Sequence, residues 1–165
     1  MAYSQGGLAT RKFLDEGNDK IGKLMMLGTP NLGAGLADFS KFMYDAQDKG
    51  YAVDWLMHSK HLGPDDEASI RFMASDSPVL GDLNTRWDNQ MAQTEGFTIV
   101  GSAVDKTLHY GWPLHQDGDT MVEKQHLAPA GVEPQLLEEG PWVKHADLPY
   151  SAQVYSKMLD HFDWA

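Results

Sequence analysis

The first eight residues contain a serine flanked closely by small residues, a pattern that fits few local backbone structures. Ser4 has Ala2 two places before it and the pair Gly6-Gly7 after it. Small residues on both sides are typical of a sharp turn from a strand into a helix, because they let the two elements approach closely around a strained turn residue. The pattern therefore predicts a strand that ends at Ser4 and a helix that begins directly after it. The apolar stripe expected on that helix consists of Leu8, Ala9, Phe13 and Leu14.

Short apolar runs between helical patterns predict an α/β fold with a mostly parallel sheet and flanking helices. The run 21–27 is closed by a Gly-Thr-Pro sequence, and the run 97–100 is followed by Gly101. Both have the length and the punctuation of buried strands. A further short strand is expected within 132–143, and an amphipathic helix over 151–162.

Residues 31–95 differ from the rest, because their pattern is helical and no strand is expected among them. Helices are predicted over 36–47, 53–61 and 65–73, bounded by glycines and prolines. A helical insertion of this size between two strands is typical of a cap or lid over a site. Its methionine and aromatic side chains would equally form the core of the insertion itself. They are Phe39, Phe42, Met43, Tyr44, Trp55, Met57 and Met73.

Composition narrows the classes of function. The chain has 165 residues, 42% of them hydrophobic, which suffices for one globular domain. Its net charge of −11 and its scattered Lys and Arg residues argue against a nucleic-acid surface. No apolar run reaches the roughly 18 residues of a transmembrane helix, and without cysteine there is neither a disulfide nor a thiolate ligand. None of these features assigns the protein to a compartment.

Three residues in chain order have the side chains of a nucleophile, an acid and a base. Ser4 lies at the predicted turn, Asp119 in an Asp-Gly-Asp-Thr loop, and His145 shortly before the last helix. A serine hydroxyl needs a histidine to take its proton and a carboxylate to orient that histidine. Each residue is expected in a turn or loop after a strand, where sites in open α/β sheets form. Taken singly, they could equally be a helix cap, a turn former and a helix neighbour.

Several motifs in the same order resemble the C-terminal part of an α/β-hydrolase of the lipase/esterase type. The turn at 2–6, Ala-Tyr-Ser-Gln-Gly, is similar to the nucleophile elbow, with Ala in place of the commoner Gly. Residues 28–33, Gly-Thr-Pro-Asn-Leu-Gly, resemble the lipase pattern Gly-Thr-Pro-His-x-Gly. Residues 73–84 are similar to a lipase lid segment, and 117–122 resemble the loop that carries the acid of the triad.

The resemblance implies hydrolysis of carboxylic esters by a triad of Ser4, Asp119 and His145, with no cofactor and no metal. Asp117 is the reserve candidate for the acid. The backbone N–H of Gln5 would supply one donor of the oxyanion hole, and the family takes the other from a loop after an early strand. The substrate would be a small-molecule or lipid ester of unspecified acyl chain and alcohol.

The resemblance starts at the elbow, so the N-terminal half of the fold is expected to be missing from this chain. A parallel sheet that ends at the elbow strand exposes an edge that is normally covered. The alternative to an esterase is therefore a truncated or non-catalytic hydrolase-like chain that binds a lipid or a protein partner. A complementary chain or a second copy would cover the edge.

The other six histidines fit a triad less well than His145. His58 and His61 lie three residues apart on one helix face and could share a metal, but no third ligand is evident. His126 follows Asp119 too closely to end the next strand. Loops or a helix surface are expected for His109, His115 and His161.

Overall fold

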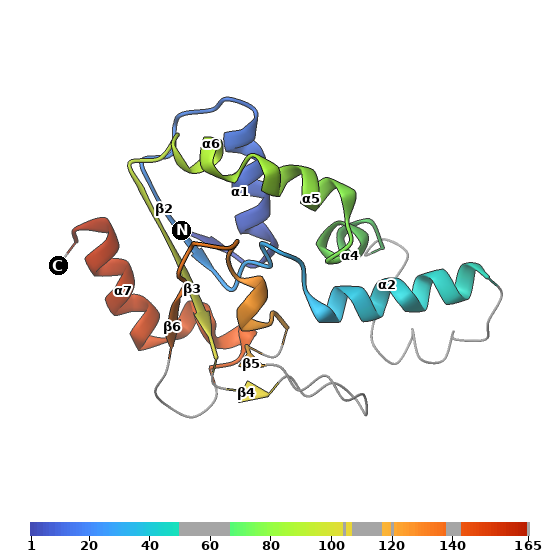
Figure 1. Cartoon of the computed structure of the whole chain (residues 1–165). Coiled ribbons are helices and arrows are strands. Elements are labelled where there is room, and N and C mark those ends of the chain that lie inside the picture. Colours follow the sequence, from blue (N-terminus) through green and yellow to red (C-terminus); the bar gives the residue numbers. More distant parts are fainter. Residues whose placement is uncertain (50–66, 104, 107–116, 120, 138–142, 165) are drawn as a thin grey trace.

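A parallel four-stranded sheet forms the centre of the molecule (Figure 1). The computed structural model describes residues 1–49, 67–103, 105–106, 117–119, 121–137 and 143–164. The strands lie in the order β1 (Ala2–Tyr3), β2 (Lys23–Leu27), β3 (Gly96–Ser102) and β6 (Gln135–Leu137). Each pairs with its neighbour in parallel. The predicted α/β fold with a parallel sheet is confirmed.

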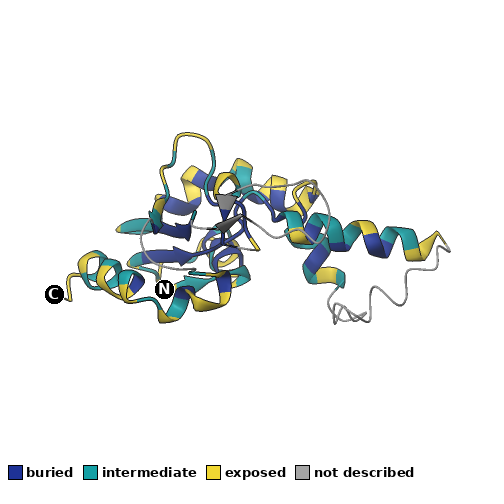
Figure 2. Cartoon of the chain, turned by 90° about the horizontal axis from the view of Figure 1, so that it is seen from below, coloured by how far each residue is buried: buried dark blue, intermediate teal, exposed yellow. Residues whose placement is uncertain are grey.

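Successive strands are neighbours in one direction across the sheet, which determines where their connections lie. Right-handed crossovers between such strands all pass over the same face. Accordingly α1 (Gln5–Asp15) and α6 (Trp87–Met91) pack together on one face, beside α5 (Pro78–Thr85). The last helix, α7 (Ala152–Phe162), follows the final strand and covers the opposite face. The centre of the sheet is therefore covered on both sides: most of β2 and the second half of β3 are buried and dark blue in Figure 2.

Strand β2 divides the interior into two cores, because its side chains alternate between the faces. Leu24 and Met26 belong to the α1-side core, whereas Met25 and Leu27 belong to the α7-side core. All four are at most 2% exposed. The α1-side core also contains Leu14, Trp87, Met91, Ile99, Val122 and Leu127. The α7-side core also contains Val100, Leu137, Leu148 and Val154.

Helix α1 begins directly after Ser4 as predicted, but its buried stripe differs from the expected one. Ala9 and Phe13 are exposed, Phe13 by 40%. The buried positions are Gly7, Leu8, Arg11 and Leu14. The sequence prediction followed hydrophobicity and so passed over Arg11, which lies at helical spacing between Leu8 and Leu14.

The insertion at 31–95 is helical in its described part, and two of its helices begin close to the predicted positions. They are α2 (Gly35–Asp48) and α4 (Glu67–Met73); α5 and α6, which follow them, were not predicted. The helix predicted over 53–61 lies outside the described residues, as do Trp55 and Met57. Met43 and Tyr44 lie in the α1-side core, whereas Phe42 is 64% exposed.

Three smaller features were not predicted. Helix α5 starts with a Ser77-Pro78 pair, and the Ser77 hydroxyl accepts a hydrogen bond from the Leu80 N–H. A two-stranded antiparallel sheet consists of β4 (Asp105–Lys106) and β5 (Asp117–Gly118), and β5 forms the first two residues of the segment predicted as the acid loop. Gly101 lies inside β3 instead of ending it. A Cβ at this position would lie 2.2 Å from Leu127 Cδ1, so the close packing of Leu127 leaves room only for glycine.

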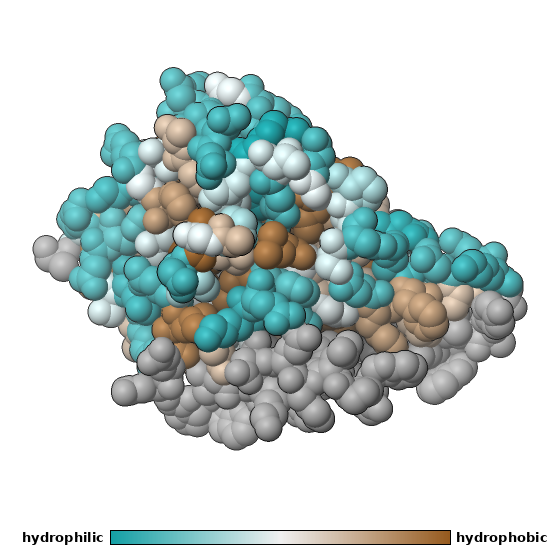
Figure 3. All heavy atoms as spheres, viewed as in Figure 1, coloured by the Kyte–Doolittle hydropathy of each residue, from teal (hydrophilic) through white to brown (hydrophobic). Residues whose placement is uncertain are grey.

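The two edge strands of the described sheet are β1 and β6. Among the described residues, β1 pairs with β2 on one side only. Apolar atoms reach the surface near the start of the chain on the face seen in Figure 3, and Met1 is 59% exposed. In the described part of the chain, no helix has the length and hydropathy needed to cross a membrane.

Candidate functional site

Ser4 occupies the turn between β1 and α1 in a strained backbone conformation. Its φ of 52° and ψ of −132° lie where residues other than glycine are rare. Such a conformation costs on the order of 1–3 kcal/mol and persists only where the surroundings impose it. Here the Ser4 N–H donates to the Leu27 carbonyl at 2.8 Å, and the Ser4 carbonyl accepts from the Gly7 N–H at 3.0 Å. The turn is thus held by both β2 and the first turn of α1.

Helix α1 can approach β2 closely because position 7 has no side chain. A Cβ on Gly7 would lie 2.1 Å from the Thr29 hydroxyl oxygen and 2.8 Å from the Thr29 Cβ. Thr29 follows β2 and is fully buried. Gly7 of the predicted turn therefore allows the close contact between helix and sheet. This contact places Ser4 at the end of the strands.

His145 reaches Ser4 from the opposite end of the chain. It begins the 3-10 helix η3 (His145–Tyr150), and its Nε2 lies 2.8 Å from the Ser4 Oγ. Its Nδ1 lies 2.7 Å from Asp119 Oδ2. The His145 and Asp119 side chains are 5% and 1% exposed. Three side chains that the sequence predicted together are therefore in one hydrogen-bonded row, with Ser4 at its more accessible end.

The backbone of the Asp119 loop fixes the carboxylate. Asp119 Oδ1 accepts from the N–H groups of Met121 and Val122 at 3.1 and 2.8 Å, which leaves Oδ2 for His145. The Asp119 carbonyl also accepts from the His145 N–H at 2.6 Å. Acid and base are consequently joined through both side chain and main chain. The side chain of the reserve candidate, Asp117, lies outside the described residues.

Gly28 lies beside the His145 imidazole and the Asp119 carboxylate. It has a φ of 53°, and its N–H donates to the Val100 carbonyl at 2.8 Å. A Cβ at this position would lie 2.8 Å from Asp119 Oδ2 and 3.1 Å from His145 Cε1. Only a glycine combines this backbone conformation with so close an approach.

Tyr3 is the contact of His145 that sequence reasoning missed. Its hydroxyl donates to the His145 carbonyl at 3.0 Å, and the two rings lie 5.0 Å apart at an interplanar angle of 35°. Burial, together with the Asp119 carboxylate, raises the pKa of Tyr3. The available signal was strand alternation, which directs Tyr3 to the same face as η3.

Arg11 connects α1, the helix that follows Ser4, to three other segments. Its guanidinium is fully buried and donates to Gln90 Oε1 and Asn31 Oδ1, both at 3.0 Å, and to Asn84 Oδ1 at 2.8 Å. It also lies 4.5 Å from the centre of the Trp87 ring. Burial lowers the pKa of Arg11 to about 10, so it stays charged at neutral pH. Asn31, which stands where the lipase pattern has His, is therefore a structural partner of Arg11.

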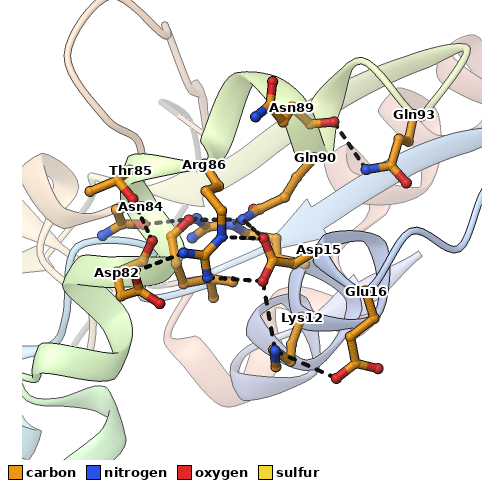
Figure 4. A network of polar contacts seen from close by, with 12 residues as sticks. Lys12, Asp15, Glu16, Asp82, Asn84, Thr85, Arg86, Asn89, Gln90 and Gln93 are labelled. Carbon is orange, nitrogen blue, oxygen red and sulfur yellow. Dashed lines mark hydrogen bonds and ion pairs between the residues drawn. The ribbon is translucent and has the colours of Figure 1, made fainter.

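A second set of polar contacts joins α1 to α5 and α6 near the surface (Figure 4). Asp15 accepts from Arg86 Nε at 2.6 Å and from Arg86 Nη2 at 2.9 Å. Arg86 also pairs with Asp82, and Asp15 lies 3.6 Å from Lys12. The hydrogen bond from Arg86 is the main reason that the pKa of Asp15 is lowered to about 2.

The remaining predicted positions are distributed as follows. Gln5 is the first residue of α1, where backbone N–H groups have no acceptor within the helix. His126 pairs with Glu123, and His161 lies on α7. Among the described residues, no group of three or more carboxylate or imidazole side chains could hold a metal. The histidines at 58, 61, 109 and 115 lie outside those residues.

Solved structures with a similar fold include a lipase and a phospholipase. The mature form of the Bacillus licheniformis lipase BlEst2 matches 95% of this chain with a TM-score of 0.58 and 20% identity. Its propeptide form matches the same share with a TM-score of 0.60 and 18% identity. The phospholipase PlaB from Legionella pneumophila matches 76% of the chain with a TM-score of 0.55 and 16% identity. The fold is therefore α/β-hydrolase-like.

The chain is shorter than each of these proteins. It spans 63% of the mature BlEst2 chain, 34% of the propeptide form and 28% of PlaB. No protein-family model and no curated protein sequence matches it. The similarity thus concerns the arrangement of helices and strands.

Proposed function

We propose that the protein is a serine hydrolase of carboxylic esters, with Ser4 as nucleophile, His145 as general base and Asp119 as the acid of a triad. The observation that carries this proposal is the row of two short contacts, Ser4 Oγ to His145 Nε2 and His145 Nδ1 to Asp119 Oδ2. The strained backbone of Ser4 and the lipase-like fold support it. Together these features match the geometry by which triads are recognised.

The proposed reaction begins when the Ser4 Oγ attacks the carbonyl carbon of the ester. The Ser4 proton moves to His145 Nε2, while Asp119 Oδ2 accepts from the Nδ1–H and stabilises the imidazolium. The tetrahedral intermediate expels the alcohol, which takes the proton from Nε2, and an acyl-serine remains. Water then attacks the acyl group by the same proton path, releasing the carboxylic acid and restoring Ser4.

The negative oxygen of the intermediate needs two hydrogen-bond donors. We assign one to the Gln5 N–H, because it follows Ser4 at the N-terminus of α1 and the helix dipole favours negative charge there. We propose that the second comes from a polypeptide segment packed against β1, which among the described residues pairs with a strand on one side only. Loss of one donor typically lowers the rate about 10²- to 10³-fold, so both donors matter for the proposed reaction.

We further propose that residues 31–95 act as a lid and that the substrate is a lipid or other apolar ester. Leu36 and Phe42 of α2 are 37% and 64% exposed, so this helix presents apolar side chains to solvent. At its start, the Gly35 N–H donates to Glu123 of the acid loop at 3.0 Å. The helix is thus anchored beside the triad and carries apolar surface away from it.

The test compares the wild-type chain with Ser4→Ala on nitrophenyl esters of short and long acyl chains. We expect hydrolysis by the wild type and only background rates for Ser4→Ala. Asp119→Asn should lower kcat by about 10⁴-fold, because the imidazole then loses its oriented tautomer. The matched control is Ser156→Ala, which removes an exposed hydroxyl on α7. Equal rates for wild type and Ser4→Ala would exclude a serine esterase and favour the non-catalytic binding chain.

A further inference from the structure

Strand β1 directs its two side chains to opposite faces of the sheet. Ala2 packs against the α1-side core, and Tyr3 packs against the α7-side core, which contains Leu148 of η3. Because η3 begins with His145, strand alternation brings the residue just before Ser4 to the backbone of the proposed base. The two-residue strand therefore leads directly into the proposed nucleophile and supplies, through Tyr3, a contact to the proposed base.

Hydrogen bonds hold the peptide groups on both sides of His145. Its N–H donates to the Asp119 carbonyl at 2.6 Å, and its carbonyl accepts from the Tyr3 hydroxyl at 3.0 Å. If only one of these two peptide groups were held, the backbone could still rotate on the other side of the residue. With the Tyr3 bond in place, the Cα of His145 is fixed relative to both the acid loop and the elbow strand.

The His145 ring, like its backbone, has contacts on several sides. Asp119 and Ser4 contact its two nitrogens, and a Cβ on Gly28 would lie 3.1 Å from its Cε1. The Tyr3 ring lies 5.0 Å away at a tilt of 35°, a separation at which aromatic rings attract each other. When the imidazole becomes an imidazolium, an aromatic ring within about 6 Å also stabilises the positive charge.

We propose that Tyr3 is a positioning residue for the reaction, holding the His145 imidazole in line between Asp119 and Ser4 through its hydroxyl and its ring. This inference rests on the proposed function of the triad. Tyr3 takes no part in proton transfer, since its hydroxyl is engaged with a main-chain carbonyl. Its contribution lies in the step where Nε2 receives the Ser4 proton, because a small displacement of the ring lengthens that contact.

Kinetic measurements separate the hydroxyl from the ring. Tyr3→Phe keeps the ring and loses the hydrogen bond, and Tyr3→Leu loses both; Tyr155→Phe removes a hydroxyl from an exposed residue of α7 as the control. We expect kcat to fall about fivefold in Tyr3→Phe, as for one lost hydrogen bond. In Tyr3→Leu it should fall on the order of 10²-fold, as for a misplaced catalytic group. KM should stay unchanged in both, because Tyr3 acts on the transition state through His145.

Nuclear magnetic resonance of the ¹⁵N-histidine-labelled chain gives a readout that needs no turnover. The ring signals of His145, assigned by their loss in His145→Ala, should shift in Tyr3→Leu and, less, in Tyr3→Phe. The ring signals of His126 should stay unchanged, as should all ring signals in Tyr155→Phe. Unchanged His145 signals in both Tyr3 variants would overturn the proposal.

The outcomes distinguish this inference from the proposed function. If wild type and Ser4→Ala hydrolyse esters equally, the proposed function fails, and the ring signals alone decide whether Tyr3 positions His145. If the wild type is an esterase and both Tyr3 variants keep its kcat, the role of Tyr3 is disproved and the triad stands. If Tyr3→Leu lacks the wild-type circular dichroism spectrum, Tyr3→Phe decides by the same two measurements.

Discussion

At the residue scale, the row of Ser4, His145 and Asp119 depends on a neighbouring residue that has no side chain, Gly28. Gly28 lies so close to His145 and Asp119 that a methyl group would enter the space of both side chains. The positive φ of Gly28 adds a second reason for glycine, since L-residues are strained there. Glycine is required at this position because of the side chains packed around it, although the residue itself has no reactive group.

Substitution of Gly28 tests this packing. We expect Gly28→Ala to lower the free energy of unfolding by about 1–3 kcal/mol through backbone strain. Ester hydrolysis should fall on the order of 10²-fold, because the added methyl displaces the imidazole. The control, Gly81→Ala, adds a methyl in open space on α5 and should stabilise the chain by about 0.5–1 kcal/mol with unchanged activity. Wild-type hydrolysis by Gly28→Ala would refute the close packing at the imidazole.

At the scale of elements, α1 holds the serine turn because it is fixed along its length. Gly7 sets its distance from β2, and Arg11 bonds to α5, to α6 and to the loop after β2. A charged side chain in this position is costly to bury, but each of its polar partners is an amide or carbonyl oxygen that needs a donor. The network therefore specifies how α1 packs against the insertion.

Removal of the guanidinium leaves those oxygens buried without donors. For Arg11→Met we expect the free energy of unfolding to fall by about 3–5 kcal/mol, measured by urea denaturation. Lys12→Met is the matched control on the same helix, because Lys12 is 54% exposed and forms only surface ion pairs. A smaller loss for Arg11→Met than for Lys12→Met would contradict the structural role of the buried network.

Acid should weaken the contact between α1 and Arg86. The pKa of Asp15 is lowered to about 2, whereas an unfolded aspartate titrates at about 3.9. Its stabilising contribution is thus present above about pH 4 and is lost as the pH falls toward 2. We expect the difference in unfolding free energy between wild type and Asp15→Asn to be largest at neutral pH, to shrink below about pH 4 and to vanish only below about pH 2. A difference that is constant from pH 7 to pH 2 would rule out this linkage.

At the scale of the whole molecule, one strand joins two cores. Neighbouring residues of β2 point to opposite sides, so the helices on both faces depend on the same four residues, Leu24 to Leu27. Coverage on both sides is the usual condition of a parallel sheet. The two cores should consequently unfold together.

Substitution of adjacent methionines tests this coupling. Met25→Ala and Met26→Ala each empty a fully buried site, one in each core, and should cost about 2–5 kcal/mol. We expect both variants to unfold in a single transition by near-UV and far-UV circular dichroism. Val79→Ala, at a position 61% exposed, should change little. Two separate transitions in either variant would mean that the faces fold independently.

The sequence by itself determined the features that neighbouring residues encode. Small residues around Ser4 predicted the turn, apolar runs with glycine and proline predicted β2 and β3, and helical periodicity predicted α1, α2 and α7. The parallel α/β class followed from the order of these patterns. The lid role of 31–95 and the catalytic roles of the three residues stay predictions.

Only the tertiary structure decided which distant side chains meet. His145 lies 141 residues after Ser4 and still reaches it, because both stand at the same end of the strands. The roles of Tyr3, Gly28 and Arg11 come from contacts with residues far along the chain, which no local pattern encodes. Local sequence sets backbone preferences over a few residues, whereas packing against the sheet determines the contacts of each side chain.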